Sequence, residues 1–437
     1  MKNAILSYHT YADLPIVESG KGIYLKDIKG KTYIDASSGA VVVGIGHGRE
    51  EIAEVLRAQA AKIAYVIRVQ FMNIPSLELS NKIATLAPKN MNRSYFVSGG
   101  SEANETAIKL SIRFQQLLGN PKKTKIISRW QSYHGNTLGA LSVSGHTKRR
   151  RDYSNLLLHM PLIPPVYCYR CPFNKKSESC DLECARELEV IVKREGPENI
   201  AAFIAEPIVG ATLGAVPPVD EYFPLIREIC DTHEMLFIAD EIMTGFGRTG
   251  KYFAMEYWNV TPDILSFGKG VTAGYSPLAG IITHKRISET FEDKATEFVH
   301  GFTFAFNPLT TAVALKVLEI VEEEQLIENA KIMGEYFVKR LTVLEELPIV
   351  GDIRGKGLLF GIEFVKNKEW KEPFPPNDHM AYKIMRDLMD RGLVIYPGSG
   401  TKDGLSGDHI LLAPPLIITK DEINKIIQIL QDYLSGL

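Results

Sequence analysis

The sequence predicts an α/β fold with a mostly parallel central sheet. Short apolar runs alternate with stretches of helical periodicity, which is the pattern of βαβ units. The runs are apolar at consecutive positions, as expected of strands buried on both faces of a parallel sheet. Polar residues follow three of the runs, and open α/β sheets bind ligands beyond the carboxyl ends of their strands. We therefore expect a ligand site at that edge.

Four runs define the predicted sheet, at residues 125–128, 201–205, 235–239 and 264–267. Between the second and the third run, Phe223, Ile226 and Ile229 recur at helical spacing within residues 222–234, which completes a βαβ unit. The residues that follow the strands include Glu206, Asp240 and Lys269. A single acid after a strand is most often a cap or a solvated side chain, but three such residues of opposite charge favour a site.

The chain has 437 residues, enough for about three domains, and its pattern changes along its length. Helical stretches are predicted at 309–324, 327–344 and 421–433, an apolar segment with several glycines at 355–365, and a hairpin at 22–35. We predict a large central domain, residues 56–320, that carries the ligand site. Residues 321–437 form a smaller α+β domain, and the N-terminal segment 1–55 packs with it.

Composition and charge exclude several classes of protein. Lys and Arg number 50 and Asp and Glu 52, so the charge gives no footprint for nucleic acid, and the basic run 148–151 is read as a solvated face. No apolar run approaches the roughly 18 residues of a membrane span, and the first residues are too polar for a signal peptide. Five cysteines, an odd number, argue against a secreted disulfide framework. We expect a cytoplasmic protein with a small-molecule partner.

Residues 97–105, VSGGSEANE, suggest an anion cradle. They precede a helix that ends before Gly119, and glycine N–H groups at a helix N-terminus capped by Ser101 suit a phosphate. No Gly-Lys-Ser/Thr follows, and the segment is not a GxGxxG turn, so nucleotide-binding loops are disfavoured. On its own the segment is equally compatible with an ordinary glycine-rich turn.

Lys269 lies between two glycines in FGKG, where small neighbours allow a bulky ligand to approach the backbone. A lysine at such a place can form a Schiff base if its pKa is lowered, although most lysines are merely solvated. Pyridoxal phosphate chemistry requires a lysine for this bond, a carboxylate against the pyridine nitrogen and a phosphate cradle. Lys269, Asp240 and the 97–105 segment supply all three.

Six ordered motifs resemble those of the class III aminotransferases, the ornithine/ω-amino-acid type of fold-type-I pyridoxal-phosphate-dependent enzymes. They are VSGGSEANE (97–105), YHG (133–135), AEP (205–207), IADEIMTGFGRTG (238–250), SFGKG (266–270) and HGFTF (300–304). The resemblance runs from the hairpin at 22–35 to APPLIIT at 413–419, nearly the whole chain. It is specific for the family and much less so for the substrate.

The resemblance implies roles for individual residues. Lys269 would hold the cofactor as the internal aldimine and later move the proton between substrate and cofactor. Asp240 would keep the pyridine nitrogen protonated, and Gly100 and Ser101 would bind the phosphate. Two further family-typical residues, for which catalytic and structural duties are not separated, are His134 and Arg248.

Other implied residues surround the cofactor ring. Tyr133 would stack on one face and Ile242 on the other, while Glu206 would support the hydroxyl side of the cofactor or the substrate pocket. Thr303 would reach the phosphate in the neighbouring subunit, so the resemblance implies a homodimer with its active site at the subunit interface.

The resemblance implies a transaminase that moves an amino group from an amine, ω-amino acid or β-amino acid donor to a 2-oxo acid by a ping-pong mechanism. A decarboxylase, aminomutase or racemase of the same family is the first alternative. A non-catalytic binding protein that keeps the fold is the alternative from another class. The intact Lys269 speaks against that last reading.

Two departures from the family limit the prediction of substrate. Many members carry an arginine shortly before the PP motif, but residues 400–415 contain none, and Lys402 is the cation there apart from the titratable His409. A carboxylate needs a positive partner, so the acceptor would bind Lys402, Arg68 or the run 148–151. Amine-type relatives also often carry a tryptophan in the N-terminal pocket segment, where this sequence has two small residues, Ala40 and Val41.

Four cysteines form an insertion in the family pattern. Cys168, Cys171, Cys180 and Cys184 have the spacing C-x2-C, eight residues, C-x3-C, which is close to that of a zinc ribbon. The second pair is also compatible with free cysteines on a helix that continues towards residue 195, and a redox disulfide is a third possibility. We assign no metal to the active site, and Cys230 is predicted to be ordinary core packing.

Overall fold

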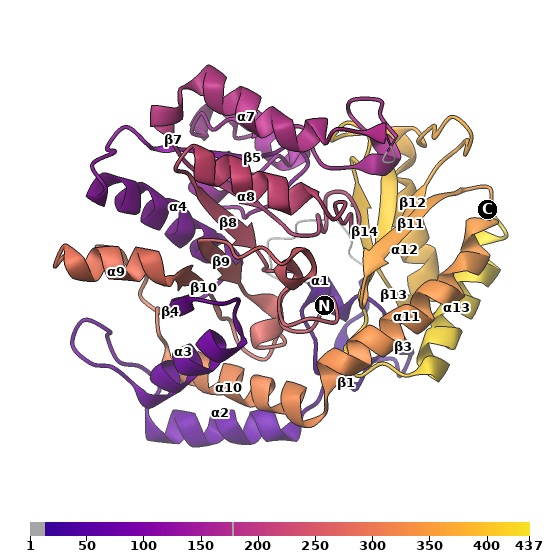
Figure 1. The fold of residues 1–437 in the computed structure, drawn as a ribbon. Coiled ribbons are helices and arrows are strands. Elements are labelled where there is room, and N and C mark those ends of the chain that lie inside the picture. The colour runs from indigo at the N-terminus through magenta and orange to yellow at the C-terminus, as the bar shows by residue number, and fades with distance from the viewer. Residues whose placement is uncertain (1–13, 177–178) are drawn as a thin grey trace.

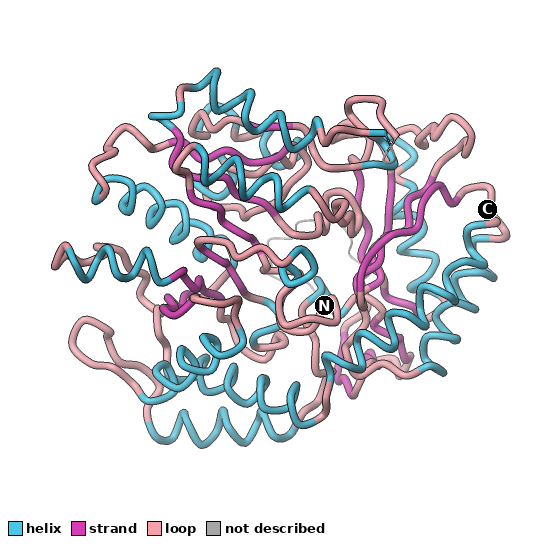
Figure 2. Tube along the Cα trace, in the orientation of Figure 1, coloured by secondary structure: helices cyan, strands magenta, loops and turns pink. Residues whose placement is uncertain are grey.

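The structure is a computed structural model that describes residues 14–176 and 179–437. It contains one large sheet and two four-stranded sheets, with helices packed around them (Figures 1 and 2). The first 13 residues, on which the prediction about a signal peptide rested, lie outside the described part. In that part no helix is both long and apolar enough to cross a membrane.

The central sheet has seven strands and is mostly parallel, as predicted. In spatial order these are β4 (Met91–Val97), β10 (Ala279–His284), β9 (Ile264–Phe267), β8 (Leu236–Asp240), β7 (Ile200–Ala205), β5 (Lys125–Arg129) and β6 (Leu162–Ile163). Strand β10 runs antiparallel to both of its neighbours, and the pairs from β9 to β6 are all parallel. The four apolar runs are therefore confirmed as adjacent strands.

Alternate residues of these strands serve two different cores. Ile204 and Ile238 face the helices α4 (Gly100–Leu117) and α9 (Lys285–Asp293). Phe203 and Phe237, their neighbours in the chain, pack with α7 (Glu183–Glu195) and α8 (Tyr222–Thr232) on the other face. Burial on both faces explains why these strands carry apolar residues at consecutive positions.

Three helices near the β4 edge form another layer, which Figure 1 shows below the central sheet. They are α2 (Glu50–Lys62), α3 (Ile74–Leu86) and α10 (Pro308–Glu323), and α10 contacts both of the others. Asn307 begins α10, since its side-chain oxygen accepts hydrogen bonds from the backbone N–H groups of Leu309 and Thr310. Three further helices are short: α1 (Ser38–Val41), α5 (Leu138–Ser142) and α6 (Thr147–Arg151).

The N-terminal strands pair with a strand from the C-terminal part of the chain in a small sheet. It contains β1 (Val17–Lys21), β2 (Tyr24–Asp27), β3 (Thr32–Asp35) and β13 (Leu393–Val394), and β3 pairs in parallel with β13. The third sheet is antiparallel, with β11 (Val350–Lys356), β12 (Leu359–Phe364), β15 (Asp408–Leu412) and β14 (Tyr396–Ser399). Its helices are α11 (Leu326–Glu345), α12 (Met380–Asp390) and α13 (Lys420–Leu434). The domain limits at residues 55 and 320 stay a prediction.

A buried charge cluster ties the cysteine-containing segment to the third sheet. Oε1 of Glu363, on β12, lies 2.6 Å from Nε of Arg170, and Oε2 lies 2.9 Å from a guanidinium nitrogen of Arg354. Burial alone would raise the pKa of Glu363, but Arg354 and Arg170 hold it below its usual range. The Tyr167 hydroxyl donates to the same carboxylate, which therefore joins residues 167–170 to β11 and β12.

Candidate active site

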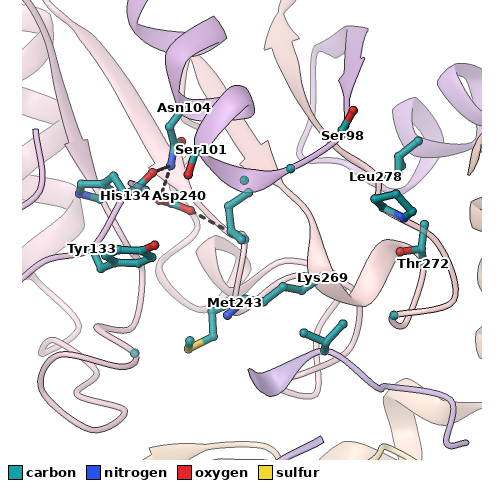
Figure 3. A pocket seen from close by; sticks show the side chains of 18 of the residues that line it. Ser98, Ser101, Asn104, Tyr133, His134, Asp240, Met243, Lys269, Thr272 and Leu278 are labelled. Atoms are coloured by element: carbon teal, nitrogen blue, oxygen red, sulfur yellow. Dashed lines mark hydrogen bonds and ion pairs between the residues drawn. The ribbon is translucent and has the colours of Figure 1, made fainter. Parts of the chain in front are cut away.

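A cavity of about 610 Å³ opens at the carboxyl edge of the central sheet. Its walls come from the ends of β7, β8 and β9, from the start of α4 and from the loop that follows β5. Seven residues predicted from the sequence line it: Gly100, Ser101, Tyr133, Glu206, Asp240, Ile242 and Lys269. Figure 3 shows how several of these side chains converge.

The carboxylate of Asp240 is fixed by three donors at the end of β8. Oδ2 lies 2.7 Å from Nδ1 of His134 and 2.8 Å from the amide nitrogen of Asn104. The backbone N–H of Ile242 donates to Oδ1 at 3.1 Å (Figure 3). Because a carboxylate only accepts, the His134 ring donates its Nδ1 proton. The arrangement stabilises a buried negative charge at one end of the cavity.

The sequence did not distinguish a catalytic from a structural role for His134, and Asn104 was not predicted as a site residue, although both lie inside the recognised motifs. Asn104 also donates to the carbonyl oxygen of His134 at 2.7 Å, so it aligns His134 and Asp240 together. Its position four residues after Gly100, one helical turn into α4, is the signal that it faces the same cavity as the helix start.

Lys269 follows β9 and begins a short 3-10 helix, Lys269–Val271, with a backbone φ of 42°. Its side chain extends into the cavity beside Met243 (Figure 3). Burial lowers the pKa of Lys269 to about 8; Asp240 opposes this shift and Arg248 adds to it. At neutral pH an appreciable share of Lys269 is therefore the uncharged amine, the form that attacks a carbonyl carbon.

The helix α4 starts at the predicted position and its first turn lines the cavity, but its cap differs from the prediction. Gly99 is the N-cap and makes no side-chain capping bond, so the assignment of Ser101 as the cap is wrong. Ser101 lies in the first turn, where its Oγ accepts a hydrogen bond from the backbone N–H of Asn136 at 3.0 Å. Since Gly100 starts the helix, the first turn faces the cavity with Ser98, Gly99, Gly100 and Ser101 along the wall.

Glycine at position 100 leaves room for its neighbour Ile242. A Cβ there would lie 3.1 Å from Cγ2 and 3.3 Å from Cδ1 of Ile242. Ile242 lines the cavity and also lies against Gly268, where an added Cβ would be 3.3 Å from its Cδ1. The two glycines therefore let Ile242 sit between the cradle and the lysine.

Glu206 positions Tyr133. Its Oε1 accepts the backbone N–H of Tyr133 at 2.9 Å. The buried Arg129 donates to the Glu206 carbonyl oxygen at 2.6 Å and lies 3.4 Å from Oε2. Tyr133 is thereby held in the cavity wall, and its ring-stacking role stays a prediction.

Thr303 is exposed and lies outside the lining of the cavity of its own chain. Its predicted contact with a neighbouring subunit stays a prediction. The two small residues of the N-terminal segment also differ from the prediction, because Val42 is the residue that lines the cavity. Val41 is buried, with φ of 62°, and Ala40 is exposed.

The cysteine segment does not form one helix. Cys168 lies in a 3-10 helix, Cys168–Arg170, and Cys184 lies on α7, but Cys180 precedes that helix. All five cysteines are within the described residues, and none forms a disulfide. Among the described residues no three Cys, His, Asp or Glu side chains are arranged to hold a metal ion. Cys230 is fully buried in the core, as predicted.

Comparison with known proteins defines the class. The chain matches the family "Aminotransferase class-III" over residues 8–434. It is 39% identical over 425 residues to the uncharacterized aminotransferase YodT of Bacillus subtilis, covering 97% of this chain and 95% of that protein. It is 34% identical to the putrescine–pyruvate aminotransferase of Pseudomonas aeruginosa, with coverage of 96% and 90%.

Solved structures agree with this relationship. A transaminase from the marine bacterium Virgibacillus superposes with a TM-score of 0.92 at 37% identity, covering 99% of this chain and 96% of that one. An (S)-enantioselective ω-transaminase from Thermomicrobium roseum gives a TM-score of 0.91 at 38% identity, with coverage of 97% and 93%. The chain belongs to the class III aminotransferase family, and the predicted fold class and enzyme class are confirmed.

Proposed function

We propose that the protein is a pyridoxal-phosphate-dependent transaminase that uses the cavity described above. The observation that carries the proposal is the convergence of Lys269, the Asp240 carboxylate and the open first turn of α4 in one cavity. The residues present fit the cofactor, since a nucleophilic amine, an anion and a phosphate cradle lie on three separate walls.

When bound, pyridoxal phosphate supplies an electron sink for a carbanion at the substrate carbon. In the proposal Lys269 would hold the cofactor through Nζ and would hold or move a proton at that atom. Asp240, oriented by His134 and Asn104, would accept a hydrogen bond from the protonated pyridine nitrogen and stabilise its positive charge. Gly100 and Ser101 orient the phosphate at the start of α4.

The proposed substrates are a small-molecule amine donor and a 2-oxo acid acceptor. The apolar residues of the cavity lining, which include Val42, Met243 and Leu278, suit the carbon chain of an amine. The relative from Pseudomonas aeruginosa is named for putrescine and pyruvate, and these two compounds are therefore the first donor and acceptor to test. The proposal places this activity in the cytoplasm, in keeping with cysteines that form no disulfide.

We also propose that the active form is a homodimer. Two segments expose apolar side chains beside each other, and Tyr65 and Phe304 join them with ring centroids 6.2 Å apart. The exposed apolar residues of these segments are Ile63, Tyr65, Ile67, Val69, Phe71, Met72, Ile74, Val299 and Phe304. A second copy would cover this patch and bring Thr303, in the same loop as Phe304, to its partner's phosphate cradle.

The proposed activity is tested by two separate half-reactions. Purified protein should be yellow, putrescine or another donor should remove the yellow band, and pyruvate or 2-oxoglutarate should restore it. Lys269→Ala should abolish both steps, whereas Lys294→Ala, at an exposed lysine, should leave them unchanged. A colourless protein that ignores added pyridoxal phosphate would refute the proposal.

The products decide between transamination and the other reactions of such sites. A transaminase gives a ketone or aldehyde together with a newly aminated oxo acid. Carbon dioxide release, an isomerised amino acid or loss of optical activity without an acceptor would identify a decarboxylase, aminomutase or racemase. Yellow protein without any half-reaction across a broad amine panel would favour a binding protein.

The dimer is tested by light scattering coupled to size-exclusion chromatography. Phe71→Asp, within the apolar patch, should give a monomer with weakened cofactor binding. Trp370→Asp is the matched control, because Trp370 is 75% exposed and lies far along the chain from the patch. A wild-type protein that elutes as a monomer with full activity would contradict this part of the proposal.

A further inference from the structure

The basic run at residues 148–151 lies on α6, close to the cavity, and its members differ in their contacts. Arg150 donates to the carbonyl oxygens of Leu141, Ser142 and Ser144 at 2.8 to 3.0 Å, so it holds the preceding loop together. Lys148 donates to the hydroxyl of Ser399 at 2.7 Å. Arg151 is exposed. Arg149 is the member of the run that contacts a residue of the cavity wall.

Arg149 lies over Tyr133, with its guanidinium carbon 5.0 Å from the ring centroid. One of its nitrogens donates to Oδ1 of Asn136 at 3.3 Å. The backbone N–H of Asn136 is in turn bound to Ser101 of the phosphate cradle. Arg149 therefore contacts one lining residue directly, Tyr133, and is joined to a second, Ser101, through Asn136. An arginine stacked on an aromatic face keeps N–H donors at its edge for an anion.

No carboxylate oxygen of the described residues lies within 4.0 Å of Arg149. Neighbouring charge is also positive: burial together with Arg149 lowers the pKa of His146 to about 4. His146 is therefore neutral at physiological pH, and among the described residues Arg149 has no carboxylate at ion-pair distance. A partly buried cation next to a ligand cavity, paired only with neutral groups, favours an anionic ligand.

The other cations proposed from the sequence are less suitable. Lys402 is exposed, and none of the described side-chain contacts joins it to a lining residue of the cavity. Arg68 donates to the carbonyl oxygen of His300 and lies over Tyr95 at 5.2 Å, and neither of these two residues lines the cavity of its own chain. Arg248 is buried and donates to the carbonyl oxygens of Leu358 and Pro414.

We propose that Arg149 binds the substrate carboxylate at the mouth of the cavity and so determines the preference for oxo acids. The inference rests on the proposed transaminase function and names the residue that replaces the arginine missing from residues 400–415. The guanidinium would bind the carboxylate through two parallel N–H donors. Substrates without a carboxylate would not use this contact.

The test compares Arg149→Gln and Arg149→Lys with Arg151→Gln, a matched control on the same helix. For pyruvate, KM should rise about 30-fold in Arg149→Gln with little change in kcat, the size expected for a lost charge-assisted hydrogen-bonded pair. For propanal, a neutral acceptor, the kinetic constants should stay within about twofold. Arg149→Lys should recover part of the loss, and Arg151→Gln should match the wild type.

A binding measurement makes the result independent of turnover. Isothermal titration calorimetry with propionate, an unreactive carboxylate, should show binding to the wild type and Arg151→Gln but not to Arg149→Gln. A yellow, active Arg149→Gln enzyme with unchanged KM for pyruvate and unchanged propionate binding would overturn the role of Arg149 alone. A wild-type protein without colour or half-reaction would overturn the cofactor proposal, and this inference with it.

Discussion

The lowered pKa of Lys269 leads to a quantitative prediction about its reactivity in the protein without cofactor. Burial moves the pKa from 10.5 to about 8. At pH 7 about one-tenth of the Lys269 side chains are then uncharged, against roughly one in 3,000 for an unperturbed lysine. The amine fraction is about 300-fold larger, and it should reach its plateau near pH 9 instead of continuing to rise past pH 10.

Labelling with fluorodinitrobenzene measures this difference directly. The cofactor-free protein is labelled briefly at a series of pH values, and peptides containing Lys269 and the exposed Lys294 are quantified by mass spectrometry. The Lys269 rate should be half-maximal near pH 8, while a lysine with the ordinary pKa gains about tenfold per pH unit up to pH 10. A Lys269 rate that keeps rising through pH 10 would refute the argument.

A charge substitution tests the cause of the shift. Asp240 raises the pKa of Lys269 and so opposes the effect of burial. Asp240→Asn should therefore move the labelling midpoint to a pH below that of the wild type. A midpoint that stays in place would mean that the two groups do not interact across the cavity.

Three further predictions concern other parts of the chain. Glu363→Gln removes the carboxylate that Arg170 and Arg354 share, so that Arg354 keeps only its pair with Asp352, and should cost about 3–5 kcal/mol of unfolding free energy, seen in denaturant titrations against the exposed Glu369→Gln. The difference in unfolding free energy between the wild type and Glu363→Gln should shrink below about pH 4.5. A carboxyl group whose pKa is lowered in the folded state stabilises the fold while it is ionised, and this stability is lost as the pH falls through the folded-state pKa. Gly100→Ala pushes a Cβ against Ile242 and should weaken cofactor affinity roughly tenfold in a spectral titration; unchanged affinity would contradict the close fit. Iodoacetamide at pH 8 should modify the exposed Cys168 but label Cys184 about a thousandfold more slowly, because burial and neighbouring thiols raise the pKa of Cys184 to about 12; equal labelling in a peptide map would speak against that burial.

Local patterns carried most of the fold prediction. Consecutive apolar residues identify doubly buried strands, and the residues that follow such strands must meet at one sheet edge whatever the rest of the chain does. Glu206, Asp240 and Lys269 could be assigned to one site for this reason. The same reasoning placed the anion cradle, because glycines before a helical period mark a helix start.

Local sequence patterns do not predict contacts between segments that are distant in the sequence. The bond between Asn104 and Asp240 joins residues 136 positions apart, and only the packing of α4 on the sheet brings them together. In the N-terminal pocket segment the backbone is irregular, because Ser38, Gly39 and Val41 all have positive φ. The direction of each side chain there does not follow from regular helical or strand spacing. Val42 therefore lines the cavity where Ala40 and Val41 were expected.

The groups proposed to react and the groups proposed to select the substrate lie on different parts of the fold. Asp240 is paired with Ser266 in the hydrogen-bonded ladder between β8 and β9, three residues before Lys269, so the spacing of strands at about 4.8 Å constrains both groups. Arg149 lies on a five-residue helix and Val42 in an irregular connection, and neither belongs to a strand of the central sheet. We therefore expect substitutions at these two positions to change substrate binding without moving Asp240 or Lys269, because the ladder resists displacement and the connecting segments tolerate it.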